Sequence, residues 1–183
     1  METPWSNSTR LEINASRQTV EDLIYWKKTY DNVWKPLNLK AASIRTADVS
    51  LSQNLWPERI RLQAATNWTE AKDATDDRNR GGRYLTFRPL NSQRIGLTCQ
   101  NRHLSAGINW RRVSKRAVLE TNSKWLGAYQ LLDARIGYTF RMRRVEMNPE
   151  IGVDNMFNEN YRIIRFAPMP LSEWFLTVRV SAP

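Results

Sequence analysis

Few side chains in this chain of 183 residues have the types and spacing of a catalytic or metal-binding site. Cys99 is the only cysteine and His103 the only histidine. A single cysteine forms no intrachain disulfide and no cysteine-based metal site, and a nucleophilic cysteine needs a histidine beside it. Cys99 shares the apolar face of its segment with Ile95 and Leu97, whereas His103 follows in a predicted turn. We therefore interpret Cys99 as a small apolar side chain.

Four carboxylates, Asp133, Glu146, Glu150 and Asp154, fall on the polar faces of predicted strands. General acid–base catalysis needs two groups within reach of one substrate. Glu146 and Glu150 would lie about 13 Å apart on an extended strand, at roughly 3.3 Å per residue. The sequence therefore predicts no enzyme, no cofactor, and no catalytic, cofactor-binding or metal-binding residue, and it identifies no substrate-binding residue.

The formal net charge of +10 is the second chemical feature of the chain. A basic chain raises nucleic acid or an anionic surface as a partner. No recognition helix or RNA-binding sheet motif accompanies the arginines, so we predict no nucleic-acid partner. The basic residues recur singly along strand-like segments and in pairs at segment ends, where they would line an aqueous lumen or lie at headgroup level: Arg59, Arg61, Arg94, Arg111-Arg112, Lys115-Arg116, Arg135, Arg141, Arg143-Arg144 and Arg179.

The segments that carry these residues alternate apolar and polar side chains with period two, which places the two kinds on opposite faces of a strand. In one segment Leu132, Ala134, Ile136, Tyr138 and Phe140 oppose Asp133, Arg135, Gly137, Thr139 and Arg141. In another Trp174, Leu176, Val178 and Val180 oppose Phe175, Thr177 and Arg179. This pattern suits a sheet with lipid on one side and water on the other.

About eight strands and no helix are predicted in this way. The strand-like runs cover residues 9–28, 36–51, 60–68, 94–100, 104–111, 132–141, 145–153 and 172–180. Turns are predicted at Asp31-Asn32, 54–58 with Pro57, Asn101-Arg102 and Arg143-Arg144, and polar connections at 70–83 and 121–124. Short turns alternating with longer connections are typical of outer-membrane barrels, whose tight turns face the periplasm.

The composition agrees with strands that cross a membrane. No run approaches the roughly 18 apolar residues of a membrane-spanning helix, whereas barrel strands alternate and give no hydropathy peak. The eight tryptophans, six tyrosines and five phenylalanines fit aromatic belts at membrane interfaces, and equally an aromatic soluble core. An arginine facing lipid at mid-depth costs roughly 2–4 kcal/mol, so the arginine-bearing faces are expected to look inward. The predicted fold class is all-β, an antiparallel up-and-down transmembrane β-barrel segment.

The stretch from Gly152 to Tyr161 lies between the last two predicted strands. Asn155 and Asn158 can satisfy backbone groups where a strand bends outward, and asparagine tolerates left-handed turn conformations. Met156, Phe157 and Tyr161 are expected to anchor that bend at the membrane interface. These residues are predicted to stabilise the barrel and not to contact a substrate.

Several segments together carry a resemblance to a known family. They are Asp22-Leu23-Ile24-Tyr25-Trp26, Trp34-Lys35-Pro36-Leu37-Asn38, Trp68-Thr69-Glu70-Ala71-Lys72-Asp73, Tyr84-Leu85-Thr86-Phe87-Arg88-Pro89, the 153–161 stretch, and Pro168-Met169-Pro170 before the closing strand. In order and spacing they resemble the C-terminal portion of the TonB-dependent outer-membrane receptors.

The resemblance implies a fold and a function. Residues 1–183 would be the C-terminal part of a receptor barrel of about 22 strands that encloses a plug. The parent protein would import an iron-siderophore complex, cobalamin or a similar nutrient across the outer membrane of a Gram-negative cell. Its partners would be outer-membrane lipid and lipopolysaccharide, with TonB and the plug domain only in a full-length parent.

Some features depart from the family. Its members carry an N-terminal plug domain and a TonB box, for which this chain has no room, and residues 1–8 lack the apolar core of a secretion signal. Leu171 and Ser172 follow Pro170 where the family commonly has glycine and arginine. The chain ends Ser181-Ala182-Pro183, not on an aromatic residue. We therefore expect a fragment of a longer receptor that is not transport-competent alone.

An alternative treats the chain as a complete small barrel of eight strands, either an outer-membrane pore or a lipocalin-like binder. A barrel of about eight strands can be filled by side chains or can hold one small ligand. A basic β-protein that binds nucleic acid is a further alternative, and it depends on charge alone.

Overall fold

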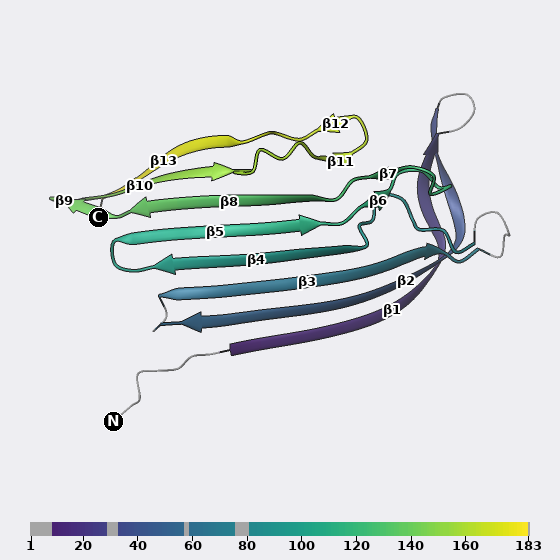
Figure 1. Ribbon diagram of the computed structural model, residues 1–183, viewed down its shortest axis with the longest axis horizontal. Coiled ribbons are helices and arrows are strands. Elements are labelled where there is room, and N and C mark those ends of the chain that lie inside the picture. Colours follow the sequence, from purple (N-terminus) through teal and green to yellow (C-terminus); the bar gives the residue numbers. More distant parts are fainter. Residues whose placement is uncertain (1–8, 29–32, 57–58, 76–80, 183) are drawn as a thin grey trace.

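Eight long antiparallel strands form one open sheet, in which each strand pairs with the next long strand along the chain (Figure 1). The computed structural model describes residues 9–28, 33–56, 59–75 and 81–182. The long strands are β1 (Thr9–Lys28), β2 (Trp34–Leu55), β3 (Ile60–Asp73), β4 (Asn91–Gln100), β5 (Leu104–Val113), β8 (Tyr129–Tyr138), β10 (Val145–Asp154) and β13 (Glu173–Ser181). Strands β1 and β13 lie at opposite edges of the sheet and do not pair. The closed small barrel is therefore not the arrangement that this chain adopts.

The described part of the chain also contains five short strands. Strand β9 (Phe140–Met142) continues the line of β8 and pairs with β10. The hairpin of β6 (Arg116–Ala117) and β7 (Trp125–Leu126) and the hairpin of β11 (Arg162–Ile164) and β12 (Ala167–Pro168) lie within the long connections. The sequence pattern did not predict these two hairpins.

The connections differ systematically between the two ends of the sheet (Figure 1). At one end β2–β3, β4–β5 and β9–β10 are joined by residues 56–59, 101–103 and 143–144. At the other end the connections cover residues 74–90, 114–128 and 155–172. This confirms the predicted alternation of tight turns and long connections. The predictions for residues 1–8, for the turn at Asp31-Asn32, for Pro57 and for part of the 70–83 loop lie outside the described residues.

The predicted loop over residues 70–83 is wrong at its start, because β3 continues to Asp73. Glu70 pairs with Arg45 and Asp73 with Ala42 of β2. A carboxylate oxygen of Glu70 lies 3.6 Å from an amino nitrogen of Arg45, and Lys72 forms an ion pair with the same side chain. This part of β3 pairs with β2 through charged side chains. It therefore lacks the alternation of apolar and polar residues from which a strand is predicted. Strand β2 is likewise longer than predicted at both ends.

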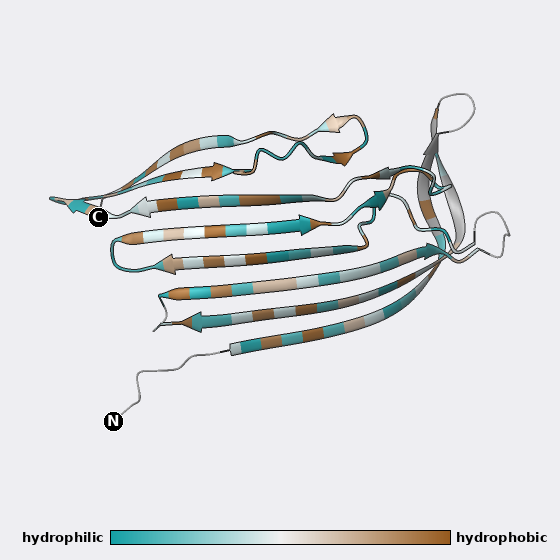
Figure 2. Cartoon of the chain, in the orientation of Figure 1, coloured by the Kyte–Doolittle hydropathy of each residue, from teal (hydrophilic) through white to brown (hydrophobic). Residues whose placement is uncertain are grey.

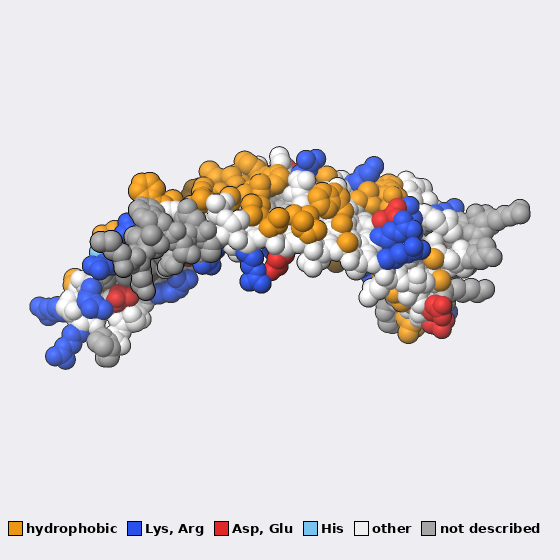
Figure 3. Space-filling view, turned by 90° about the horizontal axis from the view of Figure 1, so that it is seen from below, with side chains coloured by type: hydrophobic (Ala, Val, Ile, Leu, Met, Phe, Trp, Pro, Cys, Tyr) orange, Lys and Arg blue, Asp and Glu red, His pale blue; other side chains and the backbone are white. Residues whose placement is uncertain are grey.

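Hydrophobic and hydrophilic residues alternate along the long strands (Figure 2), and the register aligns the apolar residues of neighbouring strands. Leu97 of β4 pairs with Leu62 of β3 and with Ile108 of β5, and Ile151 of β10 pairs with Ile136 of β8 and Leu176 of β13. The space-filling view shows this apolar surface along the convex side of the curved sheet (Figure 3). Convexity and apolar character coincide, as predicted for the lipid-facing side of a barrel wall.

The sheet is a single layer without a conventional hydrophobic core. Among the described residues the buried apolar side chains are few and mostly small: Ala42, Ala71, Val113, Ala117, Val118, Leu131 and Val153. By contrast Trp174 is 68% exposed, Leu176 70% and Ile95 47%. A water-soluble domain rarely exposes so large a contiguous apolar surface, because hiding that surface is the main driving force of folding. In the described part of the chain no helix is long and apolar enough to span a bilayer.

Candidate functional site

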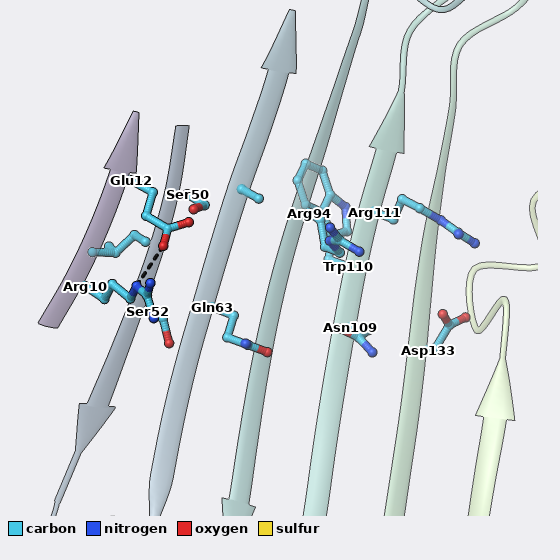
Figure 4. A pocket seen from close by; sticks show the side chains of 12 residues that line it. Arg10, Glu12, Ser50, Ser52, Gln63, Arg94, Asn109, Trp110, Arg111 and Asp133 are labelled. Atoms are coloured by element: carbon cyan, nitrogen blue, oxygen red, sulfur yellow. Dashed lines mark ion pairs between the residues drawn. The ribbon is translucent and has the colours of Figure 1, made fainter. Parts of the chain in front are cut away.

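The concave face of the sheet carries the polar residues of each strand and forms the candidate functional site. One line of cross-strand partners runs Glu12, Ser50, Ala65, Arg94, Arg111, and the next runs Arg10, Ser52, Gln63, Gly96, Asn109, Asp133. A hollow of about 740 Å³ lies over these two lines (Figure 4). The alternation that turns the apolar side chains outward therefore concentrates charged and amide groups over this concave surface.

Arg94 and Arg111 are the central cations of this surface. They are direct cross-strand partners on β4 and β5, both are exposed, and within the described chain neither forms an ion pair (Figure 4). Like charges directly opposite each other destabilise an antiparallel pair. Nearby, Arg10 and Glu12 form an ion pair at 2.7 Å. The arginine pair therefore offers uncompensated positive charge to a negatively charged group from outside this segment.

A second hollow of about 520 Å³ lies on the same face, toward the long connections. Asp48 and Asn67 form part of its wall, and the amide nitrogen of Asn67 donates to the Asp48 carboxylate at 2.6 Å. Arg94 and Arg111 border this hollow as well as the first one. The two hollows are therefore parts of one polar trough.

Arg116 closes the long-connection end of the trough. Only 3% of this residue is exposed, although it carries a charge. Its Nε donates to the carbonyl oxygen of Ile163 at 3.2 Å, its guanidinium also donates to the carbonyl of Arg162, and it lies 5.5 Å from the ring centroid of Tyr129. These contacts tie the 114–128 connection to the 155–172 connection. The spacing of the basic residues predicts a lumen or headgroup position for Lys115-Arg116 and does not indicate this role.

Tyr161 belongs to the same cluster, which corrects its predicted position at the membrane interface. Its ring centroid lies 4.6 Å from that of Tyr129, on the concave side. Burial raises the pKa of the Tyr161 phenol, and the positive charge of Arg111 opposes that shift. Ile163 of the 155–172 connection borders the trough, and Tyr161 packs against Tyr129 at the same end of the sheet. Met156 and Phe157 are exposed, and their contact with a membrane interface stays a prediction.

Asn155 organises the bend that follows β10, as predicted. It has a positive φ of 50°, is 4% exposed, and donates its side-chain amide to the carbonyl oxygens of Glu159 at 2.9 Å and Pro170 at 3.3 Å. Its Oδ1 accepts from the Glu159 amide at 2.9 Å, while its own backbone amide donates to Asp133 at 2.9 Å. Asn158, with φ 53°, accepts from the Ser172 amide at 3.0 Å. Both asparagines therefore support the bend.

Glycines on the concave face give large side chains room to lie flat. A Cβ atom added to Gly152 would overlap the ring of Phe175, its partner on β13. An added Cβ on Gly107 would lie 3.4 Å from Nε of Arg135, and on Gly96 2.9 Å from Oδ1 of Asn109. In the sequence, these glycines take the place of a polar residue between two apolar ones. That position could have predicted that a neighbouring side chain lies over each glycine.

The remaining candidates for chemistry lie apart from one another. Cys99 is half-buried on the apolar face, where it pairs with Ile60 and Ala106. The His103 ring stacks on Tyr138, with Nδ1 3.1 Å from the Thr139 carbonyl oxygen.

The carboxylates are engaged separately, and they do not converge on one point. Glu146 lies 3.4 Å from Arg141 and Glu150 3.9 Å from Arg179, while Asp133 accepts the Asn155 amide. Within the described ranges no group of three or more His, Cys, Asp or Glu side chains is arranged to hold a metal ion.

Comparison with known proteins extends this description. The model of the TonB-dependent receptor-like β-barrel family matches residues 3–156. No curated protein matches the chain.

Three solved structures show the same fold. The ferric preacinetobactin receptor BauA of Acinetobacter baumannii is 16% identical with a TM-score of 0.76, covering 93% of this chain and 27% of its own. The copper transporter OprC is 19% identical with a TM-score of 0.75, covering 94% and 28%. The ferric citrate transporter FecA is 14% identical with a TM-score of 0.74, covering 94% and 29%. This chain thus spans under a third of the length of each.

Proposed function

Since this chain belongs to the TonB-dependent receptor β-barrel family, we propose that it forms the C-terminal wall of a nutrient receptor in the outer membrane of a Gram-negative cell. The observation that carries the proposal is the separation of faces in one layer. Over the middle of β3, β4 and β5 the convex face is apolar, and the concave face carries Arg94 and Arg111 (Figure 3). Lipid would contact the first face and an aqueous lumen the second.

The parent receptor would import a metal complex or a similar scarce nutrient. The three structural neighbours are a ferric siderophore receptor, a copper transporter and a ferric citrate transporter, so the shared fold serves several cargoes. The whole of residues 1–183 would be one barrel segment, and TonB coupling would belong to other parts of a longer protein. We propose no catalytic role for this segment, in keeping with a family of receptors.

The concave trough would receive the plug domain and border the path of the nutrient. Uncompensated arginines such as Arg94 and Arg111 suit carboxylates from either source, because guanidinium–carboxylate hydrogen bonds are strengthened where water is excluded. A sheet whose edges β1 and β13 remain apart encloses no pore, so this segment alone would not carry out transport.

The assignment of the two faces can be tested with neighbouring residues of β4. In a Cys99→Ser background, Leu97→Cys places a thiol on the convex face and Thr98→Cys places one on the concave face. The full chain is folded into phospholipid vesicles and treated with a membrane-impermeant maleimide. We expect rapid labelling at position 98 and protection at position 97. Equal labelling at both positions in a folded sample would refute the proposal.

A further inference from the structure

The end of the sheet with the tight turns has a composition of its own. We call it the short-turn rim and define it by Trp56 and Arg59, by Arg102 and His103, and by Arg143 and Arg144. The three turns lie side by side because the strands between them alternate in direction (Figure 1). Every residue of this rim is exposed.

The rim carries an excess of positive charge. Within the described chain none of its four arginines forms an ion pair. The nearest acid on the adjoining strands, Glu146, lies 3.4 Å from Arg141 of β9. The turn between β2 and β3 also contains Glu58, which is outside the described residues, so the four arginines leave a net charge of 4 − 1 = +3. Blue side chains gather at this end of the molecule (Figure 3).

At the opposite end of the sheet, basic side chains form ion pairs with an acid. There Glu70 forms ion pairs with both Arg45 and Lys72, and Asp73 accepts the backbone amide of Thr75 at 2.8 Å. Glu120, Asp154 and Glu159 add further acids to the long connections. Positive charge is in excess at both ends, but it is denser in the short turns. Their nine residues have a net charge of 4 − 1 = +3, whereas the 50 residues of the connections 74–90, 114–128 and 155–172 have a net charge of 9 − 4 = +5.

Large apolar side chains lie directly beside the rim arginines. Trp56 is 70% exposed within the rim, and Tyr138, Phe140 and Met142 are exposed where β8 and β9 approach it. Phe140 and Met142 belong to the convex face, since they pair with Met147 and Val145 of β10. Aromatic side chains next to arginines at the end of an apolar surface are typical of the level of lipid headgroups.

The backbone of the rim is also unusual. Arg143 has a φ of 58° and Trp56 a φ of 42°, in the left-handed region that glycine and asparagine adopt more readily. A tight turn at either point would form more easily with one of those residues. The rim therefore holds a cation and an aromatic ring at positions where the backbone disfavours them, which points to a contact that these side chains make.

We propose that the short-turn rim binds the headgroups of anionic phospholipids, of the phosphatidylglycerol type. A guanidinium group donates two parallel hydrogen bonds to phosphate oxygens, and basic groups near an anionic membrane surface gain electrostatic attraction. This inference rests on the proposed function, which places lipid against the convex face. It adds the lipid class and the leaflet, which is the one that the tight turns reach.

The test compares vesicle binding of the full chain and two triple variants. The rim variant is Arg102→Gln/Arg143→Asn/Arg144→Gln. The control variant, Arg88→Gln/Lys124→Gln/Arg165→Gln, removes the same charge from exposed positions in the long connections. Each protein is diluted from urea into vesicles of phosphatidylcholine, with or without phosphatidylglycerol, and bound protein is measured by flotation and its β-structure by circular dichroism.

For the wild type and the control variant we expect phosphatidylglycerol to raise the binding constant, by about fivefold for each rim arginine engaged at low salt. For the rim variant we expect most of this gain to be lost, with binding to phosphatidylcholine unchanged. An equal gain in the rim variant, or an equal loss in the control variant, would overturn the proposal.

Two further outcomes separate the possible causes of failure. If the wild type does not bind phosphatidylcholine vesicles at all, the proposed function fails, because the apolar face then has no affinity for lipid. If the rim variant lacks β-structure, the single substitution Arg143→Asn decides the question. Asparagine tolerates the left-handed conformation, so this variant retains the turn while it loses one charge.

Discussion

Asn155 is the residue whose replacement should most clearly separate backbone and side-chain contributions to this fold. Its side chain makes three hydrogen bonds, to Glu159 twice and to Pro170 once, from a position that is 4% exposed. Each such bond contributes roughly 0.5–1.5 kcal/mol net. Its φ of 50° would cost an alanine about 1–2 kcal/mol, whereas glycine adopts it freely.

These quantities predict an order of stability. Asn155→Gly loses the three hydrogen bonds but keeps the backbone conformation, which costs roughly 2–3 kcal/mol in the free energy of unfolding. Asn155→Ala loses both, and is expected to be about 1–2 kcal/mol less stable than the glycine variant. Asn155→Asp retains the shape and the acceptor for the Glu159 amide, but it places an oxygen against the carbonyls of Glu159 and Pro170. We expect it to be no more stable than the glycine variant.

The assay is urea unfolding of the full chain in phospholipid vesicles, followed by tryptophan fluorescence. Asn158→Gly serves as the matched control. Asn158 has a similar φ of 53°, but it is exposed and its side chain accepts one hydrogen bond, from the backbone amide of Ser172. Its cost should stay below about 1 kcal/mol. The reasoning is refuted if the alanine variant unfolds within 0.5 kcal/mol of the wild type, or if the glycine and alanine variants are equally stable.

Three other substitutions test separate parts of the structure. Gly152→Ala should destabilise the chain by about 1–3 kcal/mol through overlap with the Phe175 ring; urea unfolding should show that Phe175→Ala in the same chain recovers part of this loss. Ile95→Arg on the convex face should cost roughly 2–4 kcal/mol in vesicles, and an equal cost for Thr98→Arg on the concave face would contradict the assignment of the faces. Arg116→Met should release the 155–172 connection, which limited proteolysis would detect as faster cleavage there than in a Lys115→Met control.

The alternation of Ile95 and Leu97 with polar residues sufficed to predict both a strand and the direction of its side chains. Lipid on one face demands an apolar residue at every second position, so the pattern is long and regular in such a chain. The same alternation predicted that Arg94 lies on the opposite face of the sheet from Ile95 and Leu97, and the structure confirms this. The left-handed conformations of Asn155 and Asn158 were predictable because few residue types adopt them readily.

The long connections were beyond this kind of prediction. Strands β6 and β7 contain two residues each, too few for any alternation to appear. Arg116 is satisfied by main-chain carbonyls, which every residue possesses, so no residue type in the sequence marks its partners. Tyr161 was expected at the membrane interface because an aromatic residue suits that place. Its ring contact with Tyr129 depends on the path of the whole 155–172 connection.

The absence of a conventional core from the described sheet has a consequence for biogenesis. Because the large apolar side chains face outward, the energy that drives this sheet to form is released only when hydrocarbon replaces water around it. Adoption of the fold and entry into the bilayer are then one event. On the proposed function, a newly made chain would cross the aqueous space before it folds, and the thickness of the receiving membrane would affect how firmly the strands are held together.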